Sequence, residues 1–99
     1  MRSIKYFVDA ISEEIEDAKE YAEKYVECKA KGDMHTANRY KEMSNDELKH
    51  AMWLHEMAVA EITEISKVYV APIAMQEAWD KSHREFTEKT AWIKQMLTM

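Results

Sequence analysis

The chain has very little of the residues that interrupt or cross-link a polypeptide. Its 99 residues include one glycine, one proline and one cysteine. So little glycine and proline excludes a loop-rich or low-complexity protein and favours long helices. A single cysteine, Cys28, excludes an intramolecular disulfide and any zinc or iron–sulfur site built from several cysteines of one chain. The composition predicts an all-α protein with its thiol in a reducing compartment.

The sequence also lacks a cluster of basic residues and a long apolar run, and each absence excludes a kind of partner. The net charge is −5, and the chain lacks the cluster of lysine and arginine that a nucleic-acid-binding surface needs. No apolar run approaches the ~20 residues of a membrane span, and the opening residues alternate with charges, unlike a signal peptide. We therefore expect no nucleic-acid partner, no membrane partner and a cytoplasmic location.

Apolar residues recur at steps of three and four along most of the sequence, which is the spacing of helices with one buried face. The predicted helices cover about residues 3–31, 34–69 and 73–97. Gly32 suits the end of the first helix and Asp33 can cap the second, so these two helices should form an antiparallel hairpin. Pro72 predicts a corner before the third helix. All three belong to one domain, residues 1–99.

Three helices do not complete a four-helix bundle within one chain. A domain of this length buries only about two-thirds of the surface that its unfolded form exposes. We therefore expect a homodimer or a higher homo-oligomer that completes a four-helix-type bundle. Three tryptophans, Trp53, Trp79 and Trp92, are hard to bury in so short a chain and favour an interface.

The second helix carries a carboxylate on its apolar face. Its predicted buried residues are Ala37, Tyr40, Met43, Glu47, Ala51, Leu54, Ala58, Ile62 and Ile65. His50 follows Glu47 by three residues, so the two side chains lie one turn apart on the same face and can share a metal ion. A buried carboxylate is unfavourable unless it is paired, hydrogen-bonded or bound to a metal. The motif therefore predicts either a metal site or a glutamate paired with a lysine or tyrosine of another helix.

The first helix offers partners for this motif. In a hairpin that turns near Gly32, residues whose numbers sum to about 60 to 66 lie opposite each other, which brings residues 14–17 level with the Glu-x-x-His motif. Glu14 borders the apolar face and is the first candidate. Asp17 and Glu16 are its rivals, and the register alone does not choose between Glu14 and Asp17.

The third helix contributes one further ligand candidate, His83. It lies beside Trp79 and Phe86 on the predicted helix, and a hydrogen-bonded core or interface histidine is the alternative interpretation. His35 and His55 are predicted to face solvent.

This set of residues resembles the ferritin-like superfamily, and within it the rubrerythrin-like branch. In that family a helix with a glutamate is followed by a helix with Glu-x-x-His, and the 33 residues between Glu14 and Glu47 are similar to the usual separation. Tyr21 and Tyr40 occupy positions where family members commonly place aromatic residues. The resemblance covers about residues 10–60 and extends to small single-hairpin relatives from bacteria and phages, the half-ferritin or encapsulated-ferritin-like proteins.

The resemblance implies a di-iron protein with ferroxidase or peroxide-reducing character. Full-length members carry two Glu-x-x-His half-sites, whereas this chain has one, so two copies would each supply Glu14, Glu47 and His50. Iron is the first expectation, with manganese or zinc as alternatives. Peroxide reduction would need an external electron donor, because the cysteine set of a complete rubrerythrin is missing. The competing interpretations are a non-catalytic helical assembly or regulatory protein without bound metal, and an acidic helical binder of another protein.

Overall fold

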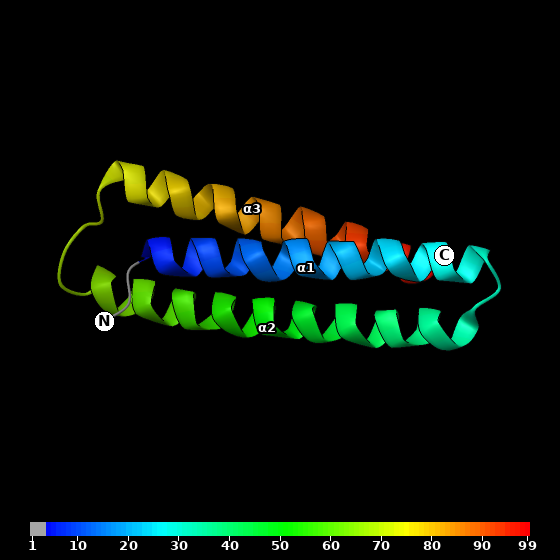
Figure 1. Cartoon of the computed structure of the whole chain (residues 1–99). Coiled ribbons are helices and arrows are strands. Elements are labelled where there is room, and N and C mark those ends of the chain that lie inside the picture. The colour runs from blue at the N-terminus through cyan, green and yellow to red at the C-terminus, as the bar shows by residue number, and fades with distance from the viewer. Residues whose placement is uncertain (1–3) are drawn as a thin grey trace.

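The computed structural model describes residues 4–99, and this part of the chain is all-helical, as predicted. The helices are α1 (Ile4–Ala30), α2 (Met34–Ser66) and α3 (Ile73–Met96). Figure 1 shows α1 and α2 as an antiparallel hairpin, with α3 returning along α1 in the same direction as α1. The described chain is elongated, 55 × 19 × 16 Å. None of its helices is long and apolar enough to cross a membrane.

The turn between α1 and α2 forms from the two residues predicted for it. Gly32 has a φ of 82°, which favours glycine, and its N–H donates to the carbonyl of Lys29. The N–H of Asp33 donates to the carbonyl of Cys28, which completes the usual hydrogen-bond pair of a glycine-terminated helix. The Asp33 side chain then accepts from the N–H of Thr36 at 3.1 Å and caps α2.

The second helix ends earlier than its apolar spacing predicts. It stops at Ser66 and not near Tyr69, and the N–H groups of Lys67 and Val68 bond carbonyls three residues back. β-Branched residues and the approach to Pro72 disfavour a further turn of α-helix. Pro72 has an extended ψ of 146° and immediately precedes α3, so the predicted corner is present.

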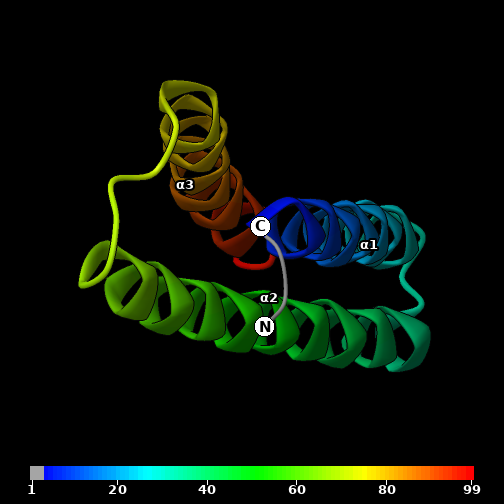
Figure 2. The ribbon, with the colours of Figure 1, turned by 90° about the vertical axis from the view of Figure 1, so that its left-hand side faces the viewer.

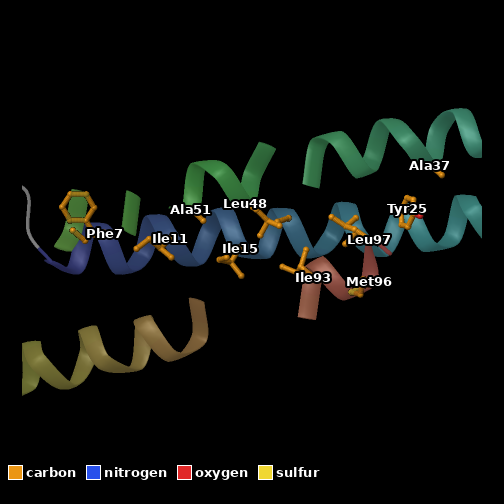
Figure 3. Packing of buried hydrophobic residues seen from close by; sticks show 13 residues of the cluster. Phe7, Ile11, Ile15, Tyr25, Ala37, Leu48, Ala51, Ile93, Met96 and Leu97 are labelled. Atoms are coloured by element: carbon orange, nitrogen blue, oxygen red, sulfur yellow. The ribbon is translucent and has the colours of Figure 1, made fainter. Parts of the chain in front are cut away.

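The hairpin packs through a seam of small residues. We use the name alanine seam for Ala18, Ala22, Ala37, Ala51 and Ala58, all fully buried. Ser44 joins them, and its hydroxyl donates to the Ala18 carbonyl at 2.7 Å. Larger side chains fill the core on either side of this seam; Figure 3 labels Phe7, Ile11, Ile15 and Leu48 among them. Because small side chains let helix axes approach closely, the alanine seam fixes the spacing of α1 and α2.

Enlarging one residue of the seam should therefore force the hairpin apart. We expect Ala51→Leu to lower the free energy of unfolding by about 1–3 kcal/mol, because a fully packed site has no room for the added methylenes. Ala60→Leu, on the exposed side of the same helix, should change it by less than about 0.5 kcal/mol. Urea denaturation of both variants measures this, and equal effects would contradict the role of the seam.

The third helix is held mainly at its C-terminal end. Ile93, Met96 and Leu97 are buried in the core, and the Lys29 ammonium donates to the backbone carbonyl of Met99. Lys89 forms an ion pair with Glu16 at 3.3 Å. Figure 2 shows the N-terminal half of α3 leaning away from the hairpin. The helix therefore packs on α1 and makes only slight contact with α2.

One face of the hairpin has no helix over it within residues 4–99. On α1, the side toward α3 carries Val8, Ser12 and Ile15, and residues two positions further along a helix point about 200° away from these. The opposite side of the hairpin, which we call the open face, carries Tyr6, Ala10, Glu14, Tyr21, Met43, Glu47, His50, Trp53, Leu54 and Met57. Most of these side chains are half-buried or exposed.

The open face accounts for a difference between the predicted and observed core of α2. Tyr40, Met43, Glu47 and Leu54 are half-buried instead of buried, while Ser44 and Leu48 take the innermost positions. The predicted apolar stripe is wider than the contact between the two helices, so its outer part is left at the surface.

Candidate metal centre

Three side chains converge on the open face, one from α1 and two from α2. His50 Nδ1 lies 3.6 Å from Glu14 Oε2 and 3.7 Å from Glu47 Oε1. One ligand atom from each of the three lies within 4.8 Å of the other two. Glu14 precedes Ala18 by four residues and Glu47 follows Ser44 by three, and the hydrogen bond from the Ser44 hydroxyl to the Ala18 carbonyl sets the antiparallel register that brings the two acids together across the hairpin.

The three groups differ in their exposure to water. The side chains of Glu14 and Glu47 are 28% and 21% exposed, whereas that of His50 is 48% exposed. The Trp53 ring, 5.7 Å from the imidazole between ring centroids, covers one side of His50. The carboxylates are therefore partly dehydrated, and the imidazole lies at the edge of the site toward the open face.

The two carboxylates carry more negative charge than their surroundings compensate. The pKa of Glu47 is raised from 4.5 to about 7, first by its hydrogen bond with Glu14, then by burial and by the charge of Glu14, while His50 acts in the opposite direction. The buried Oε2 of Glu14 has no hydrogen-bond donor among residues 4–99 when both acids are ionised. A proton on Glu47 would supply a donor to the Glu14 carboxylate. A bound cation would compensate the same charge.

This donor set fits a divalent metal ion of the first transition series. Two carboxylates and one imidazole suit iron, manganese or zinc, and the absence of thiolates from the set differs from most structural zinc sites. Three ligands from one chain also leave coordination positions for further groups. The residues present therefore fit the metal that the Glu-x-x-His motif predicts.

The structure places the other candidate ligands elsewhere. Asp17 is exposed on α1 beside Glu16 and Glu20 and is not part of the cluster. His83 lies on α3, where its Nδ1 is 2.9 Å from His55 Nε2. His83 is therefore hydrogen-bonded, as the alternative interpretation predicts, but it is exposed and not part of the core.

One histidine prediction is wrong. His55 is half-buried and stacks on Phe86, with ring centroids 4.5 Å apart, whereas His35 is exposed as predicted. His55 is covered because the side of α2 that carries it faces α3, and the apolar spacing of the sequence does not give the direction of α3. The signal available in the sequence was the aromatic spacing of Trp79, His83 and Phe86 on one face of the third helix.

The raised pKa of Glu47 makes the free energy of unfolding of the metal-free protein depend on pH in a predictable direction. The metal-free folded protein binds more protons than the unfolded chain between about pH 4.5 and 7, so its free energy of unfolding should fall as the pH rises through that interval. We expect a loss of about 1–2 kcal/mol after solvent screening. Thermal or urea unfolding across this interval measures it in comparison with Glu47→Gln, which lacks the titrating group. Parallel curves for the two proteins would contradict this assignment.

Comparison with known proteins adds no relative. No family model, curated protein or solved structure matches this chain. The ferritin-like resemblance therefore remains an interpretation of the motif formed by Glu14, Glu47 and His50.

Proposed function

We propose that this chain is a ferritin-like metal-binding protein that holds a pair of iron ions between two copies of itself and oxidises ferrous iron, with dioxygen or peroxide as the oxidant. The observation that carries the proposal is the convergence of Glu14, Glu47 and His50 around a buried carboxylate oxygen that lacks a donor. Iron supplies the one-electron chemistry when bound. The chain supplies the ligands and the partly dehydrated surroundings.

The proposed roles of the residues follow from their surroundings. Glu14 and Glu47 would bind the cations through oxygens that already face each other across the hairpin, and His50 would supply one nitrogen per chain. Because the pKa of Glu47 is raised to about 7, metal binding below that pH would displace a proton from Glu47, so metal affinity should rise with pH up to about 7. The Trp53 ring would restrict water at the imidazole.

The proposal needs a second copy because one chain gives an incomplete site. His50 is half-exposed, and large apolar side chains surround it on the open face: Trp53 is 52% exposed, Tyr6 46% and Met57 43%. The chain exposes 6603 Å², compared with about 5,900 Å² for a typical monomer of this mass. A two-fold axis through the open face would cover these residues, complete a four-helix bundle and add a second set of the three ligands.

The test is to load the metal-free protein anaerobically with ferrous iron, to count iron per chain, and then to admit oxygen or peroxide while following absorbance. The proposal expects about one iron per chain, two per dimer, and rapid oxidation. Parallel titrations with Mn²⁺ and Zn²⁺ compare the alternative ions. Bound iron that is not oxidised would remove the oxidase part of the proposal, and absence of any bound metal would overturn the metal site.

A non-catalytic helical assembly protein is the second candidate, and one observation favours it. The pKa of Glu47 is raised to about 7 by its hydrogen bond with Glu14, so a proton shared by the two acids would satisfy them without any metal. In that case the acids serve as a buried hydrogen-bonded pair and the open face binds a second copy for structural reasons. This candidate predicts full association and stability in the presence of a metal chelator.

A further inference from the structure

A second cluster of side chains, separate from the proposed iron site, connects α2 to α3. His55 of α2 is surrounded by aromatic rings of α3: its ring centroid lies 4.5 Å from that of Phe86 and 5.1 Å from those of Trp79 and His83. His55 Nε2 lies 2.9 Å from His83 Nδ1. Two imidazole nitrogens from different helices therefore point at each other beside two large aromatic rings.

At least one of the two rings, that of His55, is in the protonation state that binds metals. A hydrogen bond between two imidazoles requires that one nitrogen donates and the other accepts, so at least one lone pair points toward the partner ring. Burial, and to a smaller extent the charge of His83, lowers the pKa of His55, while Glu56 acts in the opposite direction. The imidazole of His55 is therefore neutral at pH 7, as a metal ligand must be.

The distance between the two nitrogens is close to the distance between two nitrogens that bind the same metal ion. Metal–nitrogen bonds of 2.0–2.1 Å at trigonal or tetrahedral angles place two nitrogens about 3.3–3.6 Å apart. From 2.9 Å this requires a widening of about 0.5 Å. His83 is exposed, and α2 and α3 make only slight direct contact, so rotation of the side chains is enough to provide it.

A candidate for a soft third ligand lies one helical turn from His55 on α2. Met52 precedes His55 by three residues on the same face of α2, and it lines, with Phe86, a groove of about 530 Å³ between α2 and α3. Within residues 4–99, Glu14, Glu47 and His50 form the only group of three or more histidine, cysteine or acidic side chains close enough to share an ion. The residues around His55 therefore offer two imidazoles and a thioether as ligands, without a cluster of carboxylates like that at Glu47.

This combination of ligands selects a soft ion. We propose that His55, His83 and Met52 form a binding site for Cu(I), with the Trp79 ring beside the ion. Thioether sulfur favours Cu(I), whereas iron and manganese prefer the carboxylates of the other site. The face of an indole ring also attracts a cation held in a partly dehydrated position. The bound ion would link α2 to α3, which otherwise packs mainly on α1.

The test is an anaerobic Cu(I) titration against a colorimetric Cu(I) chelator, with Cys28→Ala as the parent protein because a free thiolate also binds Cu(I). We expect about one Cu(I) per chain. Adding His83→Gln, which keeps a hydrogen-bonding side chain beside His55, should weaken binding at least about 100-fold, because loss of a direct ligand exceeds the 10–100-fold effect of an outer partner. Met52→Leu, of similar volume, should weaken it about tenfold or more.

The controls separate this site from the proposed iron site. Glu47→Gln should bind Cu(I) as the parent does, and copper-edge X-ray absorption should show nitrogen and sulfur neighbours. Equal Cu(I) affinity in the parent and in His83→Gln would overturn the proposal, as would a copper ion without a sulfur neighbour. Circular dichroism of each variant verifies that the helices are retained.

Discussion

Glu47→Gln should strongly weaken metal binding and at the same time make the metal-free protein more stable near neutral pH. The amide has the shape of the carboxyl group, and its NH₂ can donate to the buried Glu14 Oε2. It also removes the repulsion between two acids that raises the pKa of Glu47 to about 7. The same substitution removes one charged ligand, so the dissociation constant for ferrous iron should rise at least about 100-fold.

Weaker iron binding combined with higher stability of the metal-free protein cannot result from damage to the fold, because damage would lower both. Iron content after anaerobic loading measures the first, and urea unfolding of the metal-free protein near pH 8 measures the second. Asp46→Asn is the matched control, because it removes the same charge from the adjacent, exposed position and should leave the iron content unchanged. A Glu47→Gln protein that binds iron like the parent would show that the three side chains are not a metal site.

Met57→Lys should convert the proposed dimer to monomers. Met57 lies seven residues beyond His50 on the open face and is 43% exposed in the single chain. An ammonium group at that position would be dehydrated in the interface without a partner. We expect the dimer dissociation constant to rise at least about 100-fold, since an unpaired buried charge in an interface is strongly unfavourable. Light scattering coupled to size-exclusion chromatography measures the mass.

The same variant tests whether the iron site depends on the second copy. Glu14, Glu47 and His50 remain intact in this variant. Loss of iron binding together with loss of the dimer would therefore show that iron binding requires the second copy. Val59→Lys is the control: Val59 is 45% exposed, but two residues further along α2 it points about 200° away from Met57. A parent protein that is monomeric, or a dimer that survives Met57→Lys, would contradict the proposed arrangement.

The features predicted correctly from the sequence depend on neighbours along the chain. The Gly32–Asp33 turn forms as predicted because a left-handed glycine and a capping aspartate act within one helical turn. The helices follow from apolar spacing for the same reason. The meeting of Glu14 with Glu47 depends on hairpin register, which a short turn fixes. The choice of Glu14 over Asp17 came only with the structure, because it depends on the rotation of α1 about its axis.

The features that were missed depend on the third helix. His55 was predicted to face solvent, and only the direction of α3 brings Phe86 and Trp79 against it. Periodicity also cannot distinguish a residue buried by its own chain from one left for a partner. Tyr40 and Met43 belong to the apolar stripe of the sequence, yet both are half-buried in the single chain.

The alanine seam has a consequence for how the hairpin could distinguish one ion from another. The alanines of the seam are fully buried, which leaves α1 and α2 little room to move closer, and the hydrogen bond from Ser44 to Ala18 opposes their moving apart. The distance between the two helix backbones is therefore fixed. Any adjustment to the radius of the ion must come from rotation about the side-chain bonds of Glu14 and Glu47. Selection of an ion by its radius would consequently be weak. The identity of the bound ion would instead depend on its charge, its preference for oxygen over sulfur ligands, and its availability in the cell.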